Sequence, residues 1–289
     1  MSDAAENERA EFATFWRGPL NPIAYACLAS FPRVRAKLRV YTYDDDLVLP
    51  AGVERADARD ICPDLSLLER YRVGGKPSIA MFADMFRYKM IRDTGCCWVD
   101  SDLICLRQPD FSSVAIIYGR QAEARGKALI NNAVLKLPPD HPLLLELIER
   151  AEAAVDADQS WGAIGPFLLT DLAERHGVDH LARDETDFYP IDADRFWRPL
   201  LPTSYDAVAK ATKRATFLHL WSAMFDRAHY DLWASPPMGS FLHGVFRRLK
   251  TLKRFERVYD ESTLSTLLEE WIAKDSAAND AVLASSKSA

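Results

Sequence analysis

Two aspartates lie one residue apart in the mostly apolar run "CCWVDSDLICL", residues 96–106. Asp100 and Asp102 follow a short apolar stretch that predicts a buried strand, so we expect both carboxylates where that strand ends. Two like charges this close repel each other, and burial makes each costly to ionise. A divalent cation removes both costs, because carboxylate oxygens suit Mg²⁺ and Mn²⁺. A turn beginning at Ser101 would let both carboxylates reach one ion, whose remaining positions suit water or substrate phosphates; the alternative is a strand-end turn with no ligand.

A carboxylate and a guanidinium precede this pair on a predicted helix. Asp84 and Arg87 are spaced i,i+3 in "SIAMFADMFRYKMIRD", residues 78–93, and therefore share one helical face. If that face turns toward Asp100, the two groups can bind sugar hydroxyls and phosphate. The alternative is that they pair with each other or cap a neighbouring element.

Strands and helices alternate along the chain, which predicts an α/β protein with a mostly parallel sheet. The predicted strands are "EFATFWRG", "KLRVYTYDDD", "CCWVD", "VAIIYGR", "ALINNAVLKL" and "ATFLHLW". The predicted helices are "PIAYACLASF", residues 78–93 with Gly95 as the stop, "HPLLLELIERAEAAV" and "GPFLLTDLAERHG". Beyond them, "FLHGVFRRLKTLKRFERVY" predicts one amphipathic helix with a basic face, and "SSKSA" a disordered tail.

Composition excludes several classes of protein. The 289 residues carry a net charge of −6, which argues against a general nucleic-acid binder. The N-terminal "MSDAAENERAEF" lacks the order of a signal peptide, and no apolar run reaches the roughly 20 residues that cross a bilayer. We therefore expect a cytoplasmic protein. The basic helix near 245–257 is expected to be a solvated face, or else a peripheral contact with the inner face of the membrane.

Several ordered blocks resemble one enzyme family. "FADMFRYKMIRDTGCCWVDSDLICL", with its gap from Asp84 to Asp100, resembles the D-x-D glycosyltransferases of the capsular-polysaccharide and mannosyltransferase type, glycosyltransferase family 32. The catalytic core of the clostridial glucosylating toxins is similar. The blocks "FWRGPLNPIAYACLASF", "INNAVLKLPPDHPLL", "GAIGPFLLTDL" and "FLHLWSAMF" also resemble this family, so the likeness covers residues 12–225.

The resemblance implies a GT-A fold, a nucleotide-binding α/β sandwich, that uses Mn²⁺ or Mg²⁺. It implies transfer of a sugar, with retention of configuration, from a UDP- or GDP-sugar to a glycan, lipid-linked or protein acceptor. We expect a catalytic domain over residues 1–240 and a C-terminal helical extension over 241–289.

The resemblance also implies roles for individual residues, carried over by position. Asp100 and Asp102 would hold the metal and the ribose and diphosphate of the donor, and His219 would approach them. Asp84, Arg87 and Asn132 would contact the donor sugar, with Arg87 also acting in catalysis. Trp16 would lie against the base and Trp221 would line the pocket.

Other interpretations stay open at this point. His219 can equally be a buried core histidine, the two tryptophans can be core, and Asn131 and Asn132 can be satisfied turn amides. A phosphohydrolase of the haloacid-dehalogenase type also places D-x-D after a strand, although its pair lies early in the chain. A non-catalytic sugar-nucleotide-binding module is the third class.

Overall fold

The computed structural model describes residues 11–124 and 127–275 and has a six-stranded sheet at its centre. The strand order is β3-β2-β1-β6-β9-β8, in which β3, β2, β1 and β6 run parallel, β9 is antiparallel to β6 and β8 is antiparallel to β9. These strands are β1 (Glu11–Phe15), β2 (Lys37–Thr42), β3 (Val53–Asp57), β6 (Cys97–Val99), β8 (Ile117–Ala124) and β9 (Lys127–Lys136). The expected α/β architecture with a mostly parallel central sheet is thereby confirmed.

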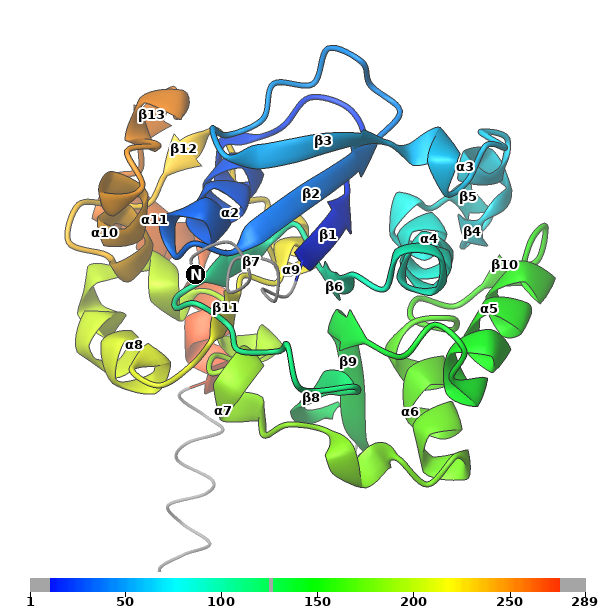
Figure 1. The fold of residues 1–289 in the computed structure, drawn as a ribbon. Helices are drawn as coiled ribbons and strands as arrows, with labels where there is room; N and C mark the ends of the chain where they lie inside the picture. The colour runs from blue at the N-terminus through cyan, green and yellow to red at the C-terminus, as the bar shows by residue number, and fades with distance from the viewer. Residues whose placement is uncertain (1–10, 125–126, 276–289) are drawn as a thin grey trace, which may run out of the picture.

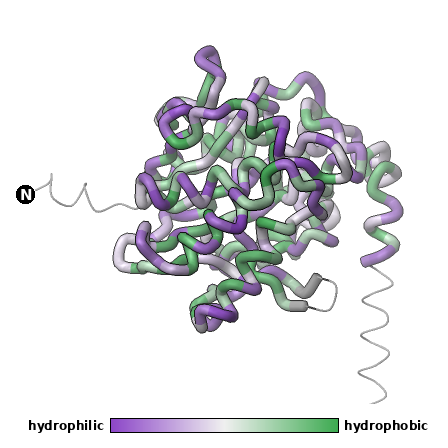
Figure 2. The backbone as a smooth tube through the Cα atoms, turned by 90° about the vertical axis from the view of Figure 1, so that its right-hand side faces the viewer, coloured by the Kyte–Doolittle hydropathy of each residue, from purple (hydrophilic) through white to green (hydrophobic). Residues whose placement is uncertain are grey.

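Helices cover both faces of this sheet (Figure 1). Successive residues of β1 alternate between the faces: Phe12 packs on Phe31 of α2 (Pro22–Arg33), whereas Phe15 packs on Phe82 of α4 (Ile79–Thr94). Beyond α4 the second face continues into α5 (Pro142–Ala153) and α6 (Pro166–Arg175). Figure 2 shows hydrophobic segments running through the interior and hydrophilic turns at the rim. No helix of the described chain is long and apolar enough to span a membrane.

Shorter elements complete the chain, and those near the site are strands β7 (Leu103–Cys105) and β11 (Phe217–His219) and helix α9 (Ser222–Arg227). The other helices are α3 (Leu67–Arg70), α7 (Glu185–Phe188), α8 (Tyr205–Thr212), α10 (Phe241–Arg248) and α11 (Glu261–Leu267). The other strands are β4 (Arg72–Val73), β5 (Lys76–Pro77), β10 (Asp158–Gln159), β12 (Ala234–Ser235) and β13 (Arg257–Val258).

Local sequence explains helix α4, which carries two residues of the candidate site. The Ser78 side chain accepts a hydrogen bond from the Met81 N–H and caps the first turn. Gly95 ends the helix with φ +70°, a left-handed conformation that glycine adopts without strain. Helix α4 packs between the sheet and α5, so its residues are buried around most of the circumference, as the apolar pattern predicted.

The prediction of one amphipathic helix after residue 240 is wrong. Helix α10 ends at Arg248, Lys250 has φ +58°, and residues 252–254 form a separate 3₁₀ turn. The chain folds back so that the ring of Phe255 stacks on that of Phe246, with centroids 5.1 Å apart. Packing of the partly buried Phe255 on the buried Phe246 therefore outweighs the helical periodicity of the sequence.

The segment after residue 240 shares a hydrophobic cluster with the rest of the chain. Leu242 and Phe246 of α10 and Leu264 of α11 belong to the same buried cluster as Ile104 of β7 and Leu218 of β11. The domain boundary at residue 240 stays a prediction, and the predicted disordered tail lies outside the described residues.

Asp275 connects the segment after residue 240 to two 3₁₀ turns, Ala193–Arg195 and Arg198–Leu200, through ion pairs. Its side chain is 7% exposed and accepts hydrogen bonds from Arg195 Nε at 2.8 Å and from Arg198 Nη2 at 2.6 Å. Burial by itself raises the pKa of Asp275, but the two arginines outweigh it and hold the pKa below its usual value.

A lowered folded-state pKa means that this carboxylate stabilises the fold above the unfolded-state pKa of about 3.9, and that the contribution is lost as the pH falls through the folded-state pKa. We expect Asp275→Asn to lower the free energy of unfolding by about 1–3 kcal/mol at neutral pH. The difference from wild type should shrink as the pH falls toward about 3. Urea unfolding across this range measures it, with the surface-exposed Asp171→Asn as a control expected to cost under about 1 kcal/mol. A difference independent of pH would contradict the ion-pair explanation.

Candidate functional site

The two aspartates of the D-x-D sequence occupy the turn between β6 and β7. The Asp100 N–H donates to the carbonyl of Ala133 in β9, and the Leu103 N–H donates back to the Asp100 carbonyl. Strand β7 then pairs with β11 in an antiparallel register that sets His219 opposite Leu103. The predicted turn at Ser101 is therefore present, and strand pairing brings a histidine from far along the chain beside it.

This turn lies where the connections of the sheet change direction. From β1 the chain proceeds outward to β2 and β3, whereas β6 lies on the other side of β1. In open α/β sheets ligands bind outside the carboxyl ends of the strands at such a point. Trp16 after β1 and Asp102 after β6 line one pocket here, of about 200 Å³. Its wall also includes Asn21, Ile23, Ala24, Ser101, Ser222, Phe225, Asp226 and Leu232.

Both oxygens of Asp102 have partners. Oδ1 lies 3.2 Å from His219 Nε2, and Oδ2 accepts a hydrogen bond of 2.8 Å from the Ser222 N–H at the start of α9. Burial raises the pKa of Asp102, but His219 and the Ser222 N–H outweigh it and hold the pKa well below the usual range. Asp102 is therefore a carboxylate in its folded environment.

An unusual backbone conformation positions the Ser222 N–H. Trp221 has φ +57° and ψ +57°, the left-handed region, which costs a residue with a side chain roughly 1–2 kcal/mol. Its ring lies on His219, with centroids 4.0 Å apart, and its Nε1–H donates to the Ile191 carbonyl. The Nδ1 of His219 is buried and has no hydrogen-bond partner within residues 11–124 and 127–275. Ring contacts with Trp221 and Tyr189 and the contact of Nε2 with Asp102 orient the imidazole.

Asp100, Asp102 and His219 each offer one ligand atom, and these atoms all lie within 4.8 Å of one another. The two carboxylates are ligands that suit Mn²⁺ or Mg²⁺, and the imidazole adds a nitrogen ligand, which a transition-metal ion such as Mn²⁺ accepts more readily than Mg²⁺. Octahedral coordination with bonds of about 2.1 Å holds neighbouring ligand atoms about 3 Å apart. The distance of 3.2 Å between Asp102 Oδ1 and His219 Nε2 is close to this value. The residues therefore fit a divalent cation.

A second group of buried polar side chains adjoins Asp100. Arg87 reaches Asp84 Oδ1 with Nη2 at 3.0 Å and Asp100 Oδ1 with Nη1 at 3.2 Å, and Nη1 also donates to the Asn132 carbonyl. The Asn132 Nδ2 donates to Asp84 Oδ1 at 2.8 Å. Burial raises the pKa of Asp84, although Arg87 and Asn132 counteract it. Asp84 and Arg87 thus pair with each other and also join the D-x-D turn to β9.

The structure separates the two neighbouring asparagines. Asn132 joins the Asp84–Arg87 group, whereas Asn131 donates from Nδ2 to the Gln121 side chain at 2.6 Å and accepts from the Ala133 N–H. Asn131 is therefore a satisfied amide of the β8–β9 hairpin. The pleat of β9 explains the difference, because successive side chains point to opposite faces.

Sequence reasoning missed three contributors to the site. The Trp98 Nε1–H donates to Asp100 Oδ1 at 2.7 Å, and its ring lies under the Arg87 guanidinium. Its position on β6, two residues before Asp100, is a signal that could have revealed it, because side chains two residues apart along a strand share one face. Gly165, before α6, has no side chain, and a Cβ there would lie 2.7 Å from an oxygen of Asp84. The third is the N–H of Ser222, which no sequence pattern marks.

Comparison with models of known families and with curated protein sequences gives no match. Among solved structures, the chain is similar to the PaToxG glycosyltransferase, with 14% identity and a TM-score of 0.43 over 58% of this chain and 69% of that one. It is also similar to the apo form of the glycosyltransferase GlyE from Streptococcus pneumoniae TIGR4, with 16% identity and a TM-score of 0.40 over 92% of this chain. The match covers 64% of the GlyE chain, slightly less than two thirds of its length.

Proposed function

We propose that the protein is a metal-dependent glycosyltransferase of the GT-A type that moves a sugar from a nucleotide-diphosphate donor to a glycan, lipid-linked or protein acceptor. One observation carries this proposal: Asp100, Asp102 and His219 converge at the carboxyl end of β6, where the sheet changes direction. The buried Asp84–Arg87–Asn132 group adjoins them. A site for a cation and a phosphate chain next to one for a polar ligand suits a sugar nucleotide.

The proposed roles follow the positions of the side chains. Asp100, Asp102 and His219 would hold Mn²⁺ or Mg²⁺, and that ion would supply Lewis-acid stabilisation of the negative charge on a departing diphosphate. Asp84 and Asn132 would hold hydroxyls of the donor sugar. Trp16, half-buried on the pocket wall, would lie against the base of a UDP- or GDP-sugar. Trp221, whose ring lies on that of His219, would hold this histidine toward the metal.

Arg87 has a positioning role in this arrangement and a catalytic role if the diphosphate reaches it. Its guanidinium fixes Asp100 and Asp84 at a set separation and carries positive charge beside the phosphate site. For transfer with retention, the departing phosphate oxygen takes the proton of the attacking acceptor hydroxyl on the same face of the sugar. No protein base is then needed between donor and acceptor.

Thermal stabilisation by metal and donor tests the proposal directly. We expect Mn²⁺ together with one member of a panel of nucleotide sugars to raise the melting temperature, and that donor to be hydrolysed slowly without an acceptor. His219→Gln should raise the Mn²⁺ concentration that gives half-maximal stabilisation by about tenfold or more, because one metal ligand is lost. The exposed His180→Gln is the matched control and should respond as wild type.

The other functional classes give different results in the same assay. A phosphohydrolase would release phosphate from simple phosphate esters without sugar transfer, and a binding module would be stabilised by a donor that it never turns over. Either outcome would overturn the proposal. A cytoplasmic location stays a prediction, which cell fractionation tests.

A further inference from the structure

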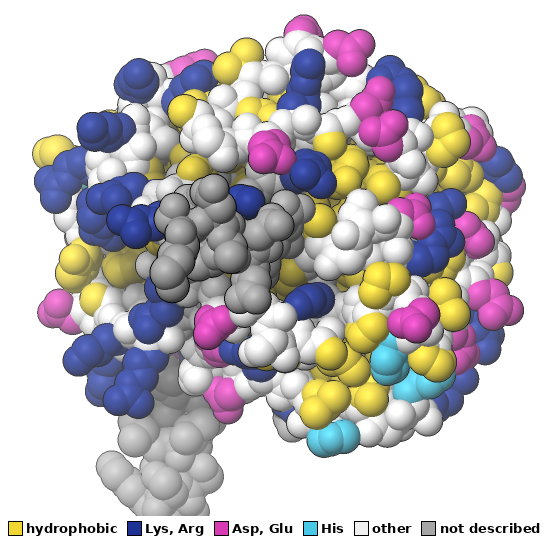
Figure 3. Space-filling view, in the orientation of Figure 1, with side chains coloured by type: hydrophobic (Ala, Val, Ile, Leu, Met, Phe, Trp, Pro, Cys, Tyr) yellow, Lys and Arg dark blue, Asp and Glu magenta, His cyan; other side chains and the backbone are white. Residues whose placement is uncertain are grey.

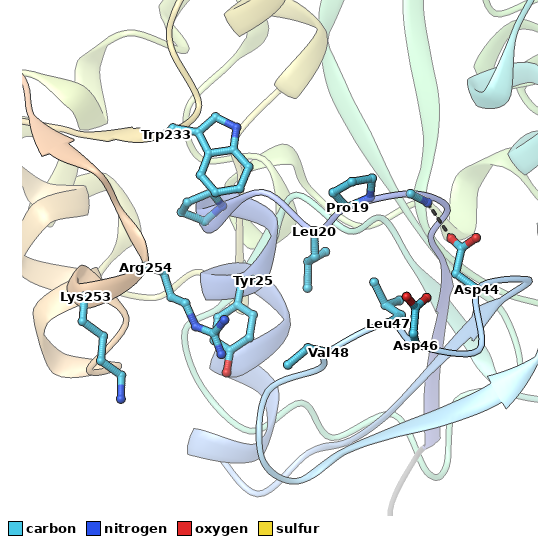
Figure 4. A pocket seen from close by; sticks show the side chains of 12 residues that line it. Pro19, Leu20, Tyr25, Asp44, Asp46, Leu47, Val48, Trp233, Lys253 and Arg254 are labelled. Carbon is cyan, nitrogen blue, oxygen red and sulfur yellow. Dashed lines mark hydrogen bonds between the residues drawn. The ribbon is translucent and has the colours of Figure 1, made fainter.

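A second, larger pocket adjoins the candidate site and has a volume of about 600 Å³ (Figure 4). The same two chain segments line both pockets. Trp16 and Leu232 line the smaller pocket, whereas Gly18 and Trp233 line the larger one. Its remaining lining residues are Pro19, Leu20, Pro22, Tyr25, Asp44, Asp46, Leu47, Val48, Lys253 and Arg254. A volume of this size suits a small ligand rather than a single ion.

One wall of this pocket is cationic. The Arg254 guanidinium lies over the Tyr25 ring, with Cζ 4.1 Å from the centroid, and Lys253 precedes it in the same 3₁₀ turn. Both side chains are exposed, and neither has an acidic partner within 4.0 Å in the part of the chain that the structure describes. Stacking occupies the face of the guanidinium and leaves its N–H edge available for a bidentate contact with an oxyanion.

The opposite wall is acidic, and its two carboxylates differ. Asp44 is engaged, because its Oδ2 accepts a hydrogen bond of 2.6 Å from the Gly18 N–H. Asp46 is exposed and lies across the pocket from Arg254 (Figure 4). Leu20 and Val48 lie between the two walls, and the Trp233 ring, which is 41% exposed, lines the pocket on the side of Tyr25 (Figure 4). A sugar suits this lining, since an aromatic ring packs on its carbon face and a carboxylate accepts hydrogen bonds from its hydroxyls.

We propose that this pocket binds a phosphorylated sugar, with the phosphate on Arg254 and Lys253 and the sugar hydroxyls toward Asp46. A phosphate carries between one and two negative charges at neutral pH and matches the Arg254 guanidinium, with the Lys253 ammonium at the preceding position of the same turn. That this phosphorylated sugar is the acceptor substrate rests on the proposed function. There the donor diphosphate occupies Asp100, Asp102 and His219, so a second phosphate belongs to the other substrate.

The charge of the segment that leads into the Lys253–Arg254 turn favours the same class of ligand. Lys and Arg side chains gather at the left edge of the molecule, over α8 and α10 and near β13 (Figure 3). Arg247, Arg248 and Lys250 are exposed on the segment that leads into the Lys253–Arg254 turn. Such a field attracts an anionic ligand and raises its rate of association.

Binding of α-glucose 1-phosphate, measured by calorimetry without metal or nucleotide, tests the pocket independently of transfer. We expect wild type to bind it, with methyl α-glucoside bound more weakly because it lacks the phosphate. Arg254→Gln should weaken binding by about tenfold or more, since the bidentate contact is lost. The matched control Arg247→Gln removes the same charge from an exposed position outside the pocket, where it adds only to the screened long-range field, and should weaken binding by less than about twofold.

Substitution of Tyr25 tests whether the ligand is bound by an oriented Arg254 or only attracted by positive charge. Tyr25→Phe keeps the ring under Arg254 and should preserve affinity, whereas Tyr25→Leu should lower it. No binding by wild type, or equal losses in Arg254→Gln and Arg247→Gln, would overturn the proposal. It would also be overturned if the chain bound phosphatidylglycerol vesicles through Arg254 and ignored the sugar phosphate, because the cationic wall would then be a membrane contact. Arg254→Gln should leave Mn²⁺-dependent donor hydrolysis unchanged, so failure here differs from failure of the proposed function.

Discussion

Asp102→Asn is expected to reduce metal-dependent sugar transfer by about a thousandfold or more while the protein remains folded. The amide keeps the shape of the side chain, and its oxygen can still accept from the Ser222 N–H. The substitution removes the negative charge that would bind a divalent cation beside His219. Loss of one preorganised electrostatic contact to a developing charge typically costs about 10²–10³ in rate, and loss of the ion costs more.

Donor turnover with and without Mn²⁺ measures this effect, and circular dichroism with thermal melting checks the fold. Asp226→Asn is a matched control, because Asp226 lines the same 200 Å³ pocket but lies outside the three-residue cluster. It should retain activity within a few-fold of wild type. Full activity of Asp102→Asn would refute the metal site, whereas equal losses in both variants would show that the pocket tolerates no change.

Replacement of Arg87 by methionine should destabilise the fold by about 3–5 kcal/mol, the largest effect on stability that we expect from one substitution. The side chains of Arg87 and Asp84 are only 6% and 12% exposed, so without the guanidinium a buried carboxylate loses its cation. Methionine retains most of the apolar volume, which limits the loss of packing. The cost therefore arises from the uncompensated charge. Urea unfolding at neutral pH measures it.

A double substitution identifies the cause. Asp84→Asn removes the charge that Arg87→Met leaves unpaired, so the double variant should be more stable than Arg87→Met alone by about 1–3 kcal/mol. Arg92→Met on the same helix is the control, because its pair with Asp93 is on the surface. That variant should lose under about 1 kcal/mol. If the destabilisation of the double variant equalled the sum of the destabilisations of Arg87→Met and Asp84→Asn, the charge explanation would be wrong.

Short-range signals in the sequence were sufficient for the elements that carry the site. Ser78 and Gly95 mark the ends of α4 through side-chain capping and a left-handed conformation, both of which depend on residues within one turn. The i,i+3 spacing of Asp84 and Arg87 likewise placed them on one face. The apolar run before Asp100 predicted a buried strand with a turn after it. These features are local, so the sequence alone determines them.

Strand pairing and burial decided the rest, because they depend on residues distant in sequence. The antiparallel register of β7 and β11 brings His219 to Asp102, and the left-handed Trp221 aims the Ser222 N–H at the same carboxylate. The pleat of β9 directs the Asn132 side chain toward Asp84, whereas that of Asn131 points to the opposite face. After residue 248 the periodicity was helical, yet the helix ends there, Phe255 packs on Phe246, and Arg254 lies over Tyr25. Periodicity records which side chains are apolar, whereas only the folded chain determines what they pack against.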